Sequence, residues 1–162
     1  MPTRQSVLDT VFLTNPSYLM IGELSLFITT AILGWLLSWS KMPLFPILNL
    51  IGCVLFLAAT GLHILCGQAH KQAHVEAKNI THIVMVGAYS KVRHPLYLSL
   101  IFMNIGIGLI SGIVCAFILT VVAGVLSVYT SLKEEKFLLK KFPKDYTEYM
   151  ELVKWRMIPG LF

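Results

Sequence analysis

The chain alternates long apolar runs with short polar segments, and this pattern predicts an all-α membrane protein. Two apolar runs cover residues 18–39 and 45–66, and a short turn separates them. A third run, residues 96–132, is nearly twice the length of about 20 residues that one bilayer crossing needs. Ser111 and Gly112 predict a break in its middle. We therefore expect a polytopic protein with about four transmembrane helices, at residues 18–39, 45–66, 95–110 and 113–132.

The composition agrees with a single membrane domain over residues 1–162. The chain is 56% hydrophobic and 13% charged, with a mean hydropathy of +0.75. This excludes an ordinary soluble domain, and no polar stretch is long enough for a second domain. Residues 1–10 are polar and no small-residue cleavage site follows the first apolar run, so we expect no removable signal peptide. Cys53, Cys66 and Cys115 lie in apolar segments without paired spacing, and we interpret them as small core residues.

The positive charges predict how the helices are oriented. Twelve of the 13 Lys and Arg residues fall on the side that four helices would give to both termini and to the loop 67–94. Lys41 lies on the opposite side. Because positive residues of membrane proteins gather in the cytoplasm, we expect both termini and this loop to be cytoplasmic. The net charge of +5 then indicates membrane lipids with anionic head groups as partners, and no nucleic acid.

The segment after residue 132 has an amphipathic pattern that continues the fourth apolar helix. Its lysines fall on one stripe, and its apolar residues fall on the opposite stripe together with Glu135. Pro143 ends this helix and can begin another. We expect the lysines to face lipid phosphates and the other stripe to turn inward. The first stripe holds Lys133, Lys136, Lys140 and Lys144, the second Glu135, Leu138, Leu139 and Phe142, and the following helix turns Tyr146, Tyr149, Val153 and Trp155 to its less polar side.

Polar and aromatic side chains gather just before the third apolar helix. Arg93 and His94 precede Pro95, and proline favours the first position of a helix. Arg93 and His94 therefore lie beside a helix N-terminus, where free backbone amides can bind a carboxylate or a phosphate. Tyr97 follows one turn into the helix, and Tyr89 precedes on the loop. Alternatively, Arg93 reaches to lipid head groups and the tyrosines form an interfacial belt.

Three ionisable residues lie in apolar surroundings and need partners. Glu135 is centred on the apolar stripe of its helix, where a carboxylate requires a partner. That partner is a buried base, a hydroxyl or a cationic ligand, or alternatively Arg93 or a lysine in a structural ion pair. Glu23 and His63 lie deep in the first two apolar runs. They either pair with each other between helices or line a cavity.

The histidines do not complete a metal site. His63, His70 and His74 recur at helical spacing, a pattern that can bind zinc or haem. However, no cysteine or carboxylate completes a compact set of ligands. We expect no metal, and we interpret His70, His74 and His82 as head-group-facing or loop residues.

Two motifs in the second half of the chain resemble those of the isoprenylcysteine carboxyl methyltransferase family. The first is Gly87-x-Tyr89-x-x-x-Arg93-His94-Pro95-x-Tyr97. The second is Glu134-Glu135-x-x-Leu138-x-x-x-Phe142-x-x-x-Tyr146-x-x-Tyr149. They occur in the right order, separated by a helical hairpin, and the membrane phospholipid methyltransferases share this general plan. The resemblance covers residues 87–162, whereas the first two apolar runs match only in length and hydropathy.

The resemblance implies an enzyme that transfers a methyl group from S-adenosylmethionine (SAM) to a lipophilic or lipidated acceptor at the boundary of membrane and cytosol. It also implies that residues 87–162 form the cofactor region. Arg93 and His94 would hold the carboxylate of SAM. Glu135, together with Glu134, would bind its ammonium or ribose. Tyr89 and Tyr97 would pack against adenine or the sulfonium, and the remaining residues of the cofactor motif are Gly87 and Pro95.

The methyl acceptor stays open at this point. Prenylcysteine-methylating members of that family tend to carry an arginine in the second helix, but this chain has no Lys or Arg between Lys41 and Lys71. The acceptor is therefore a prenylcysteine carboxylate, a lipid amine or a small thiol. An amine would have to lose a proton, and Glu23 and His63 are then the catalytic candidates. Two other functions compete: a membrane reductase with a nicotinamide cofactor, and a non-enzymatic scaffold that binds lipid through its basic tail.

Overall fold

The structure is a computed structural model, and it describes residues 16–44, 46–72 and 77–162. Within these ranges the chain forms five α-helices and two short 3-10 helices, and no named strand. The α-helices are α2 (Pro16–Leu36), α3 (Ile47–Ala69), α4 (Pro95–Ser111), α5 (Val114–Lys141) and α6 (Pro143–Leu152), and the 3-10 helices are η1 (Ala77–Asn79) and η2 (Gly87–Ser90). The prediction of an all-α fold is confirmed.

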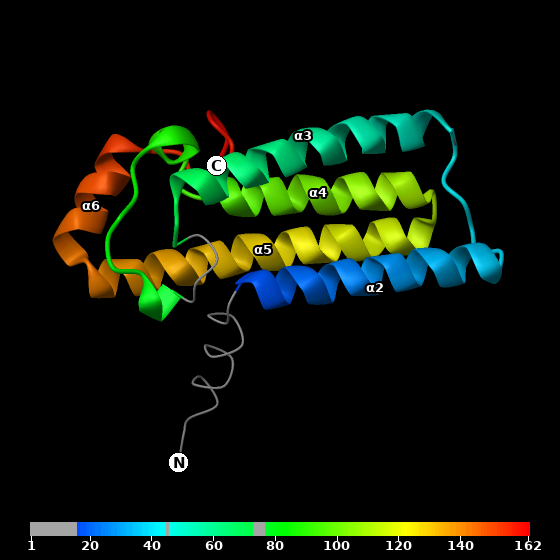
Figure 1. Ribbon diagram of the computed structural model, residues 1–162, viewed down its shortest axis with the longest axis horizontal. Coiled ribbons are helices and arrows are strands. Elements are labelled where there is room, and N and C mark those ends of the chain that lie inside the picture. The colour runs from blue at the N-terminus through cyan, green and yellow to red at the C-terminus, as the bar shows by residue number, and fades with distance from the viewer. Residues whose placement is uncertain (1–15, 45, 73–76) are drawn as a thin grey trace, which may run out of the picture.

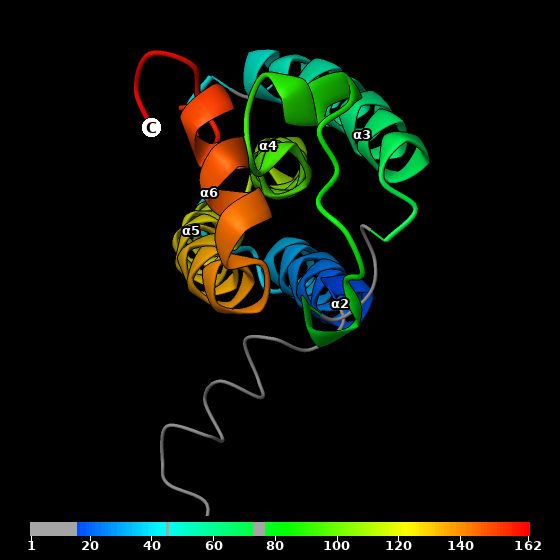
Figure 2. The ribbon, with the colours of Figure 1, turned by 90° about the vertical axis from the view of Figure 1, so that its left-hand side faces the viewer.

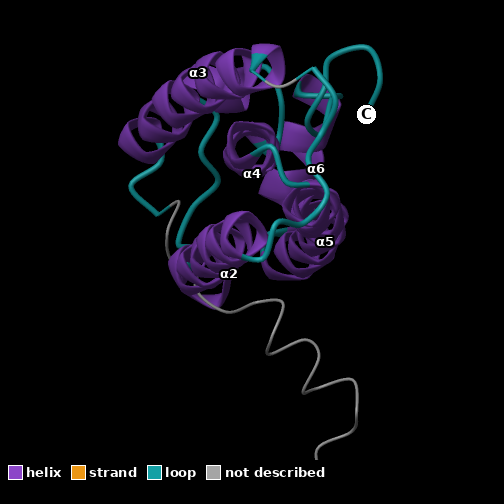
Figure 3. Ribbon diagram, turned by 90° about the vertical axis from the view of Figure 1, so that its right-hand side faces the viewer, coloured by secondary structure: helices purple, strands orange, loops and turns teal. Residues whose placement is uncertain are grey.

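Four long helices lie side by side, and α6 crosses one end of this bundle (Figure 1). α4 is central, because α3 packs along one side of it and α5 along another, while α2 packs against both α5 and α4. The end-on views show α2 and α3 on different sides of α4 (Figures 2 and 3). The end of the bundle that carries α6 also carries η2 and the C-terminus (Figure 1). The polar motifs of the sequence therefore meet at one end of the molecule.

The opposite end of the bundle is closed by two short connections that bond to each other. The N–H of Met42 donates to the carbonyl of Gly112 at 2.8 Å, and the N–H of Val114 donates to the carbonyl of Ser40 at 3.1 Å. Gly112 ends α4 with a φ of 65°, a left-handed conformation that glycine adopts without strain. The break expected at Ser111 and Gly112 is confirmed, and it leads α4 directly into α5.

The outer faces of the long helices are apolar, as contact with a bilayer requires. α3 and α5 are long and apolar enough to cross a membrane, and α2 and α4 contribute shorter apolar helices. Leu57 on α3 and Val125 on α5, for example, are 69% and 65% exposed. Contiguous apolar surface of this extent is rare on soluble proteins. The chain is an integral membrane protein.

The last part of α5 and the helix after it agree with the amphipathic pattern. α5 continues past its apolar part to Lys141, and Pro143 is the first residue of α6. The prediction of an inward stripe is confirmed for Glu135 and Leu138, which are buried, and Lys136, Lys140 and Lys144 are exposed. Of the residues expected to turn inward after Pro143, Tyr146, Tyr149 and Val153 are buried. The expectation is wrong for Trp155, which is 41% exposed.

The cysteines do not share one environment. Cys66 is buried, but Cys53 and Cys115 are exposed on the outer faces of α3 and α5, and all three are free thiols. Their interpretation as core residues is therefore wrong for two of the three. The physical reason is that a bilayer accepts apolar side chains on the outside of a helix as readily as a protein core accepts them on the inside.

α3 and α4 pack so closely that their backbones touch at glycine residues. A Cβ atom on Gly52 would lie 2.8 Å from the carbonyl oxygen of Gly106, and a Cβ atom on Gly106 would lie 2.9 Å from the backbone nitrogen of Phe56. Backbone atoms cannot rotate away as a side chain can, so any larger residue here pushes the helices apart.

Replacing Gly52 with leucine should lower the free energy of unfolding by about 1–3 kcal/mol or more, the usual cost of overpacking. The midpoint of thermal unfolding in detergent measures this change. Gly61→Leu on the same helix is the matched control, because a Cβ atom on Gly61 meets nothing within 4 Å. Equal shifts for the two variants would contradict the close packing of α3 on α4.

Candidate functional site

The candidate site lies where the loop before α4 meets the end of α5 and the segment that follows α6. Gly87 opens η2 with a φ of 63°, which favours glycine. The hydroxyl of Ser90 donates to the carbonyl of Gly87 at 2.8 Å and closes this turn. Pro95 is the first residue of α4, as predicted. Arg93 and His94 therefore lie directly before that helix.

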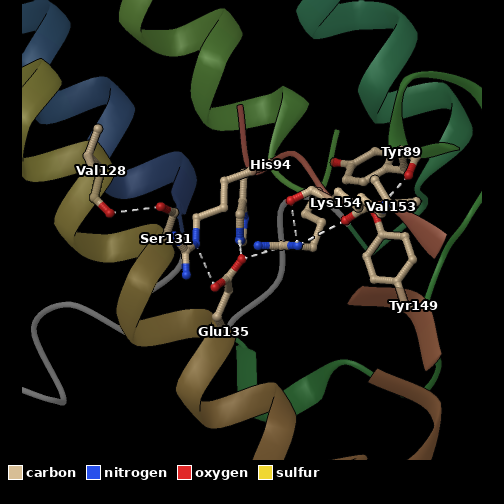
Figure 4. A network of polar contacts seen from close by, with 10 residues as sticks. Tyr89, His94, Val128, Ser131, Glu135, Tyr149, Val153 and Lys154 are labelled. Atoms are coloured by element: carbon tan, nitrogen blue, oxygen red, sulfur yellow. Dashed lines mark hydrogen bonds and ion pairs between the residues drawn. The ribbon is translucent and has the colours of Figure 1, made fainter. Parts of the chain in front are cut away.

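Glu135 is the centre of a cluster of charged groups (Figure 4). Arg93 Nε donates to Glu135 Oε1 at 2.8 Å, and Arg156 Nε donates to Oε2 at 2.9 Å. His94 Nε2 lies 3.3 Å from Oε1, within ion-pair distance, but makes no hydrogen bond of good geometry. The side chains of Arg93, His94 and Glu135 are each 5% exposed, and that of Arg156 is 34% exposed. The ion pair with Arg93, which the sequence left open, is present.

These neighbours keep the Glu135 carboxylate ionised. Glu135 lies beyond residue 132, where the apolar part of α5 ends. Burial by itself would raise its pKa, but the contacts from His94, Arg156 and Arg93 outweigh burial and lower the pKa to about 2. With Glu135 ionised, each arginine has a counter-charge at hydrogen-bonding distance.

The C-terminal segment, residues 153–162, covers the backbone beside this cluster. The N–H of Arg93 donates to the carbonyl of Trp155 at 2.9 Å, and the N–H of His94 donates to the carbonyl of Arg156 at 2.7 Å. Arg93 Nη1 adds hydrogen bonds to two further carbonyls of this segment. Carbonyl groups of the same chain therefore already accept the hydrogen bonds of these two amides.

Aromatic side chains surround the other glutamate of the pair, Glu134. It is half-buried and lies near enough to Tyr97, Tyr89 and Tyr146 to act on them electrostatically. Within the described part of the chain, no ion pair joins Glu134 to a basic side chain. The two adjacent glutamates thus differ, since Glu135 is neutralised by arginines whereas Glu134 faces tyrosines.

The tyrosines are held in place by the elements around them. The hydroxyl of Tyr149 donates to the carbonyl of Tyr89 at 2.7 Å (Figure 4). The ring of His70, at the end of α3, meets the ring of Tyr89 edge-on with centroids 5.1 Å apart, and His94 meets Tyr97 in the same way at 5.7 Å. Burial raises the pKa of the Tyr89 hydroxyl above its ordinary value, which already lies well above neutral pH. The cofactor residues expected from the sequence therefore gather at one end of the bundle.

Glu23 lies on the apolar helix α2 and His63 on the apolar helix α3, and both contact α4. Asn104 Nδ2 donates to Glu23 Oε2 at 2.9 Å. His63 Nδ1 lies 3.0 Å from the hydroxyl oxygen of Ser99. The sequence left open whether the two ionisable residues pair with each other, and the structure gives each of them a partner on the central helix.

Sequence reasoning missed Arg156, Ser99 and Asn104. Asn104 interrupts an otherwise apolar helix, and that interruption was a usable signal, whereas nothing in the spacing of Arg156 points to Glu135. Among the residues that the structure describes, no three His, Cys, Asp or Glu side chains gather as metal ligands. His74 lies outside those residues.

The comparison with known protein families concerns the same region. Residues 47–145 match the family model described as phospholipid methyltransferase, which is more than half of the chain. The chain belongs to the phospholipid methyltransferase family. No curated protein and no solved structure matches it. The resemblance found in the sequence motifs is thereby confirmed.

Membership in the phospholipid methyltransferase family makes this chain a membrane methyltransferase that acts on lipid-related substrates. The matched residues include the loop before α4 and the glutamate pair on α5. They exclude α2, which carries Glu23, and the C-terminal segment, which carries Arg156. These two residues therefore belong to parts of the chain that the family match does not cover.

Proposed function

We propose that this protein is an integral-membrane, SAM-dependent methyltransferase that methylates a lipophilic acceptor at the cytoplasmic boundary of the membrane. The observation that carries the proposal is the surroundings of Glu134. This carboxylate faces tyrosines and has no basic partner among the described residues. It lies beside a buried cluster in which His94 Nε2 makes no hydrogen bond. In a methyltransferase, this acidic side chain and the neighbouring basic cluster suit a cofactor that carries both a positive and a negative charge.

The residues present fit the chemistry of SAM, which combines an ammonium, a carboxylate, a sulfonium and an adenine. Glu134 offers a negative charge for the ammonium or the ribose. Arg93 and His94 offer positive and hydrogen-bonding groups for the carboxylate. Tyr89 and Tyr97 offer aromatic faces, which attract a cation such as a sulfonium.

We assign Glu135 a positioning role rather than a ligand role. Both of its oxygens already accept hydrogen bonds from arginines, so a cofactor ammonium would have to displace Arg156 to reach it. Its carboxylate instead fixes Arg93 and His94 at the start of α4. This differs from the resemblance, which gives Glu135 the leading part in binding.

When bound, SAM supplies a methyl group activated on sulfur. The contribution of the chain is to hold the acceptor in line with that group and to exclude water, which lowers the barrier more than a strong base would. A carboxylate acceptor is already nucleophilic at neutral pH. An amine acceptor must first release a proton, and Glu23 and His63 are the ionisable side chains of the first two spans.

The positive charges support a cytoplasmic position for the site. Lys136, Lys140 and Lys144 are exposed at the end of the bundle that carries α6, where anionic head groups attract them. In this orientation the cofactor enters from the cytosol, and the lipophilic acceptor enters from the bilayer. We further propose that residues 1–162 act as one membrane domain, with the cofactor held by residues 87–162.

Calorimetry with the full-length protein in a neutral maltoside detergent tests the cofactor. We expect saturable binding of SAM and of S-adenosylhomocysteine, followed by transfer of labelled methyl groups to a lipophilic amine, carboxylate or thiol. If well-folded protein binds neither ligand, the proposal fails, and titration with nicotinamide cofactors then tests the reductase alternative.

A further inference from the structure

Glu23 is the one Asp, Glu, Lys or Arg residue in the four apolar spans. Residues 16–36, 47–69, 95–111 and 114–132 contain no Lys, Arg or Asp and no other Glu. A carboxylate at membrane depth is costly unless it has a partner, and such residues usually serve function. Glu23 also lies outside the family match, so the family does not explain its presence.

The structure gives Glu23 a neutral partner but no positive one among the spans. Asn104 Nδ2 donates to one carboxylate oxygen at 2.9 Å, and Asn104 is itself only 6% exposed. A buried amide of this kind orients the carboxylate without neutralising its charge. Glu23 is half-buried, so part of its side chain remains accessible.

The position of Asn104 links Glu23 to the proposed cofactor site. Asn104 follows Tyr97 by seven residues on α4. Seven residues are close to two full turns, so both side chains leave the same face of the helix, about 10 Å apart along its axis. Tyr97 lies near enough to Glu134 to interact with it electrostatically. A molecule entering from the bilayer along this face would therefore pass Glu23 before it reaches the glutamate that we assign to the cofactor.

We propose that Glu23, oriented by Asn104, is a specificity-determining residue that recognises the positively charged amine head of a lipophilic acceptor. The inference rests on the proposed function for its biological meaning, but the binding it describes does not require the cofactor. This role of Glu23 favours the amine among the three acceptor classes. Glu23 would repel an anionic carboxylate and would add no electrostatic attraction for a neutral thiol.

Binding of three lipophiles with one chain length tests this inference in the absence of cofactor. The probes are dodecyltrimethylammonium, dodecanol and dodecanoate, which share an apolar tail and carry a positive, a neutral and a negative head. They are titrated into full-length protein in neutral maltoside micelles. We expect wild-type protein to bind the ammonium probe most tightly, and Glu23→Gln to bind it about tenfold more weakly or worse. Dodecanol should bind both proteins equally.

Two variants control for folding and geometry. Glu23→Asp keeps the charge and should keep the preference for the ammonium probe. Ser25→Ala, at an exposed position on the same helix, should leave all three affinities unchanged. The inference is overturned if wild-type protein does not prefer the ammonium probe to dodecanol, or if Glu23→Gln binds it as tightly as wild type. Failure of the proposed function is recognised separately, because it appears as absent binding of SAM and S-adenosylhomocysteine.

Discussion

Replacing Glu135 with alanine should destabilise the protein by about 3–5 kcal/mol, the usual cost of removing one partner from a buried ion pair. The loss is large because the variant leaves Arg93 buried without its counter-charge. The effect should spread to the C-terminal segment, because Arg93 and His94 hold that segment through their backbone amides. Thermal unfolding in detergent measures the stability, and limited proteolysis reports on the segment.

Two further variants and the pH dependence of stability test the same assignment. Arg156→Ala should cost only about 1 kcal/mol, because the Arg156 side chain is 34% exposed and water can replace its contact. Glu134→Ala should cost little, since no ion pair among the described residues depends on it. The pH dependence gives an independent check, because the pKa of Glu135 is lowered to about 2. The stabilisation by this carboxylate should be complete above about pH 4.5 and should disappear as the pH falls towards 2, but only in protein that retains Glu135.

A Glu135→Ala variant as stable as wild type but unable to bind SAM would contradict this assignment. That result would mean that Glu135 is a cofactor ligand and that its arginine contacts contribute little. The Glu135→Ala variant thus distinguishes a positioning role from a binding role for Glu135. The sequence motif favours binding, whereas the arginine contacts favour positioning.

The sequence predicts the inward orientation of Glu135 and offers Arg93 as one possible partner, but it does not predict the contact with Arg156. The orientation follows from helical periodicity, which depends only on neighbours within a few turns. The contact with Arg156 depends on the path of the chain through α6 and back across α4, and no local pattern encodes that path. For the same reason, the hydrogen bonds from the amides of Arg93 and His94 to residues 155 and 156 have no sequence signature, since any residue supplies a backbone carbonyl.

Hydropathy explains why the apolar spans were predictable and the faces of their helices were not. Long apolar runs predict bilayer crossings because length and composition suffice. Whether Cys53 or Cys115 faces lipid or protein leaves no mark on hydropathy, because both environments are apolar. Glycines at close helix contacts and polar residues within apolar runs say more about which helix faces meet in such a chain. Gly52 and Gly106 mark the contact of α3 with α4, and Asn104 marks the place where Glu23 meets α4.

Glu134→Gln should abolish most cofactor binding while leaving the fold intact. A hydrogen bond to a charged group contributes about 1.5–3 kcal/mol, so the affinity for SAM should fall by about 10- to 150-fold. The fold should survive because the substitution preserves size and breaks no ion pair among the described residues. Calorimetry with purified protein measures the affinity. Glu148→Gln, which removes an exposed carboxylate on α6, is the matched control and should bind SAM as wild type does.

Three ligands identify the group that Glu134 contacts. SAM and S-adenosylhomocysteine share the ammonium, but only SAM carries the sulfonium, and 5′-methylthioadenosine has the ribose without the amino-acid part. If Glu134 holds the ammonium, Glu134→Gln should weaken SAM and S-adenosylhomocysteine equally and leave 5′-methylthioadenosine unchanged. Weakening of all three ligands would assign Glu134 to the ribose, and weakening of SAM alone would assign it to the sulfonium. Unchanged affinity for all three would remove Glu134 from the cofactor site and return Glu135 to consideration, with Arg156 as the group that a cofactor displaces.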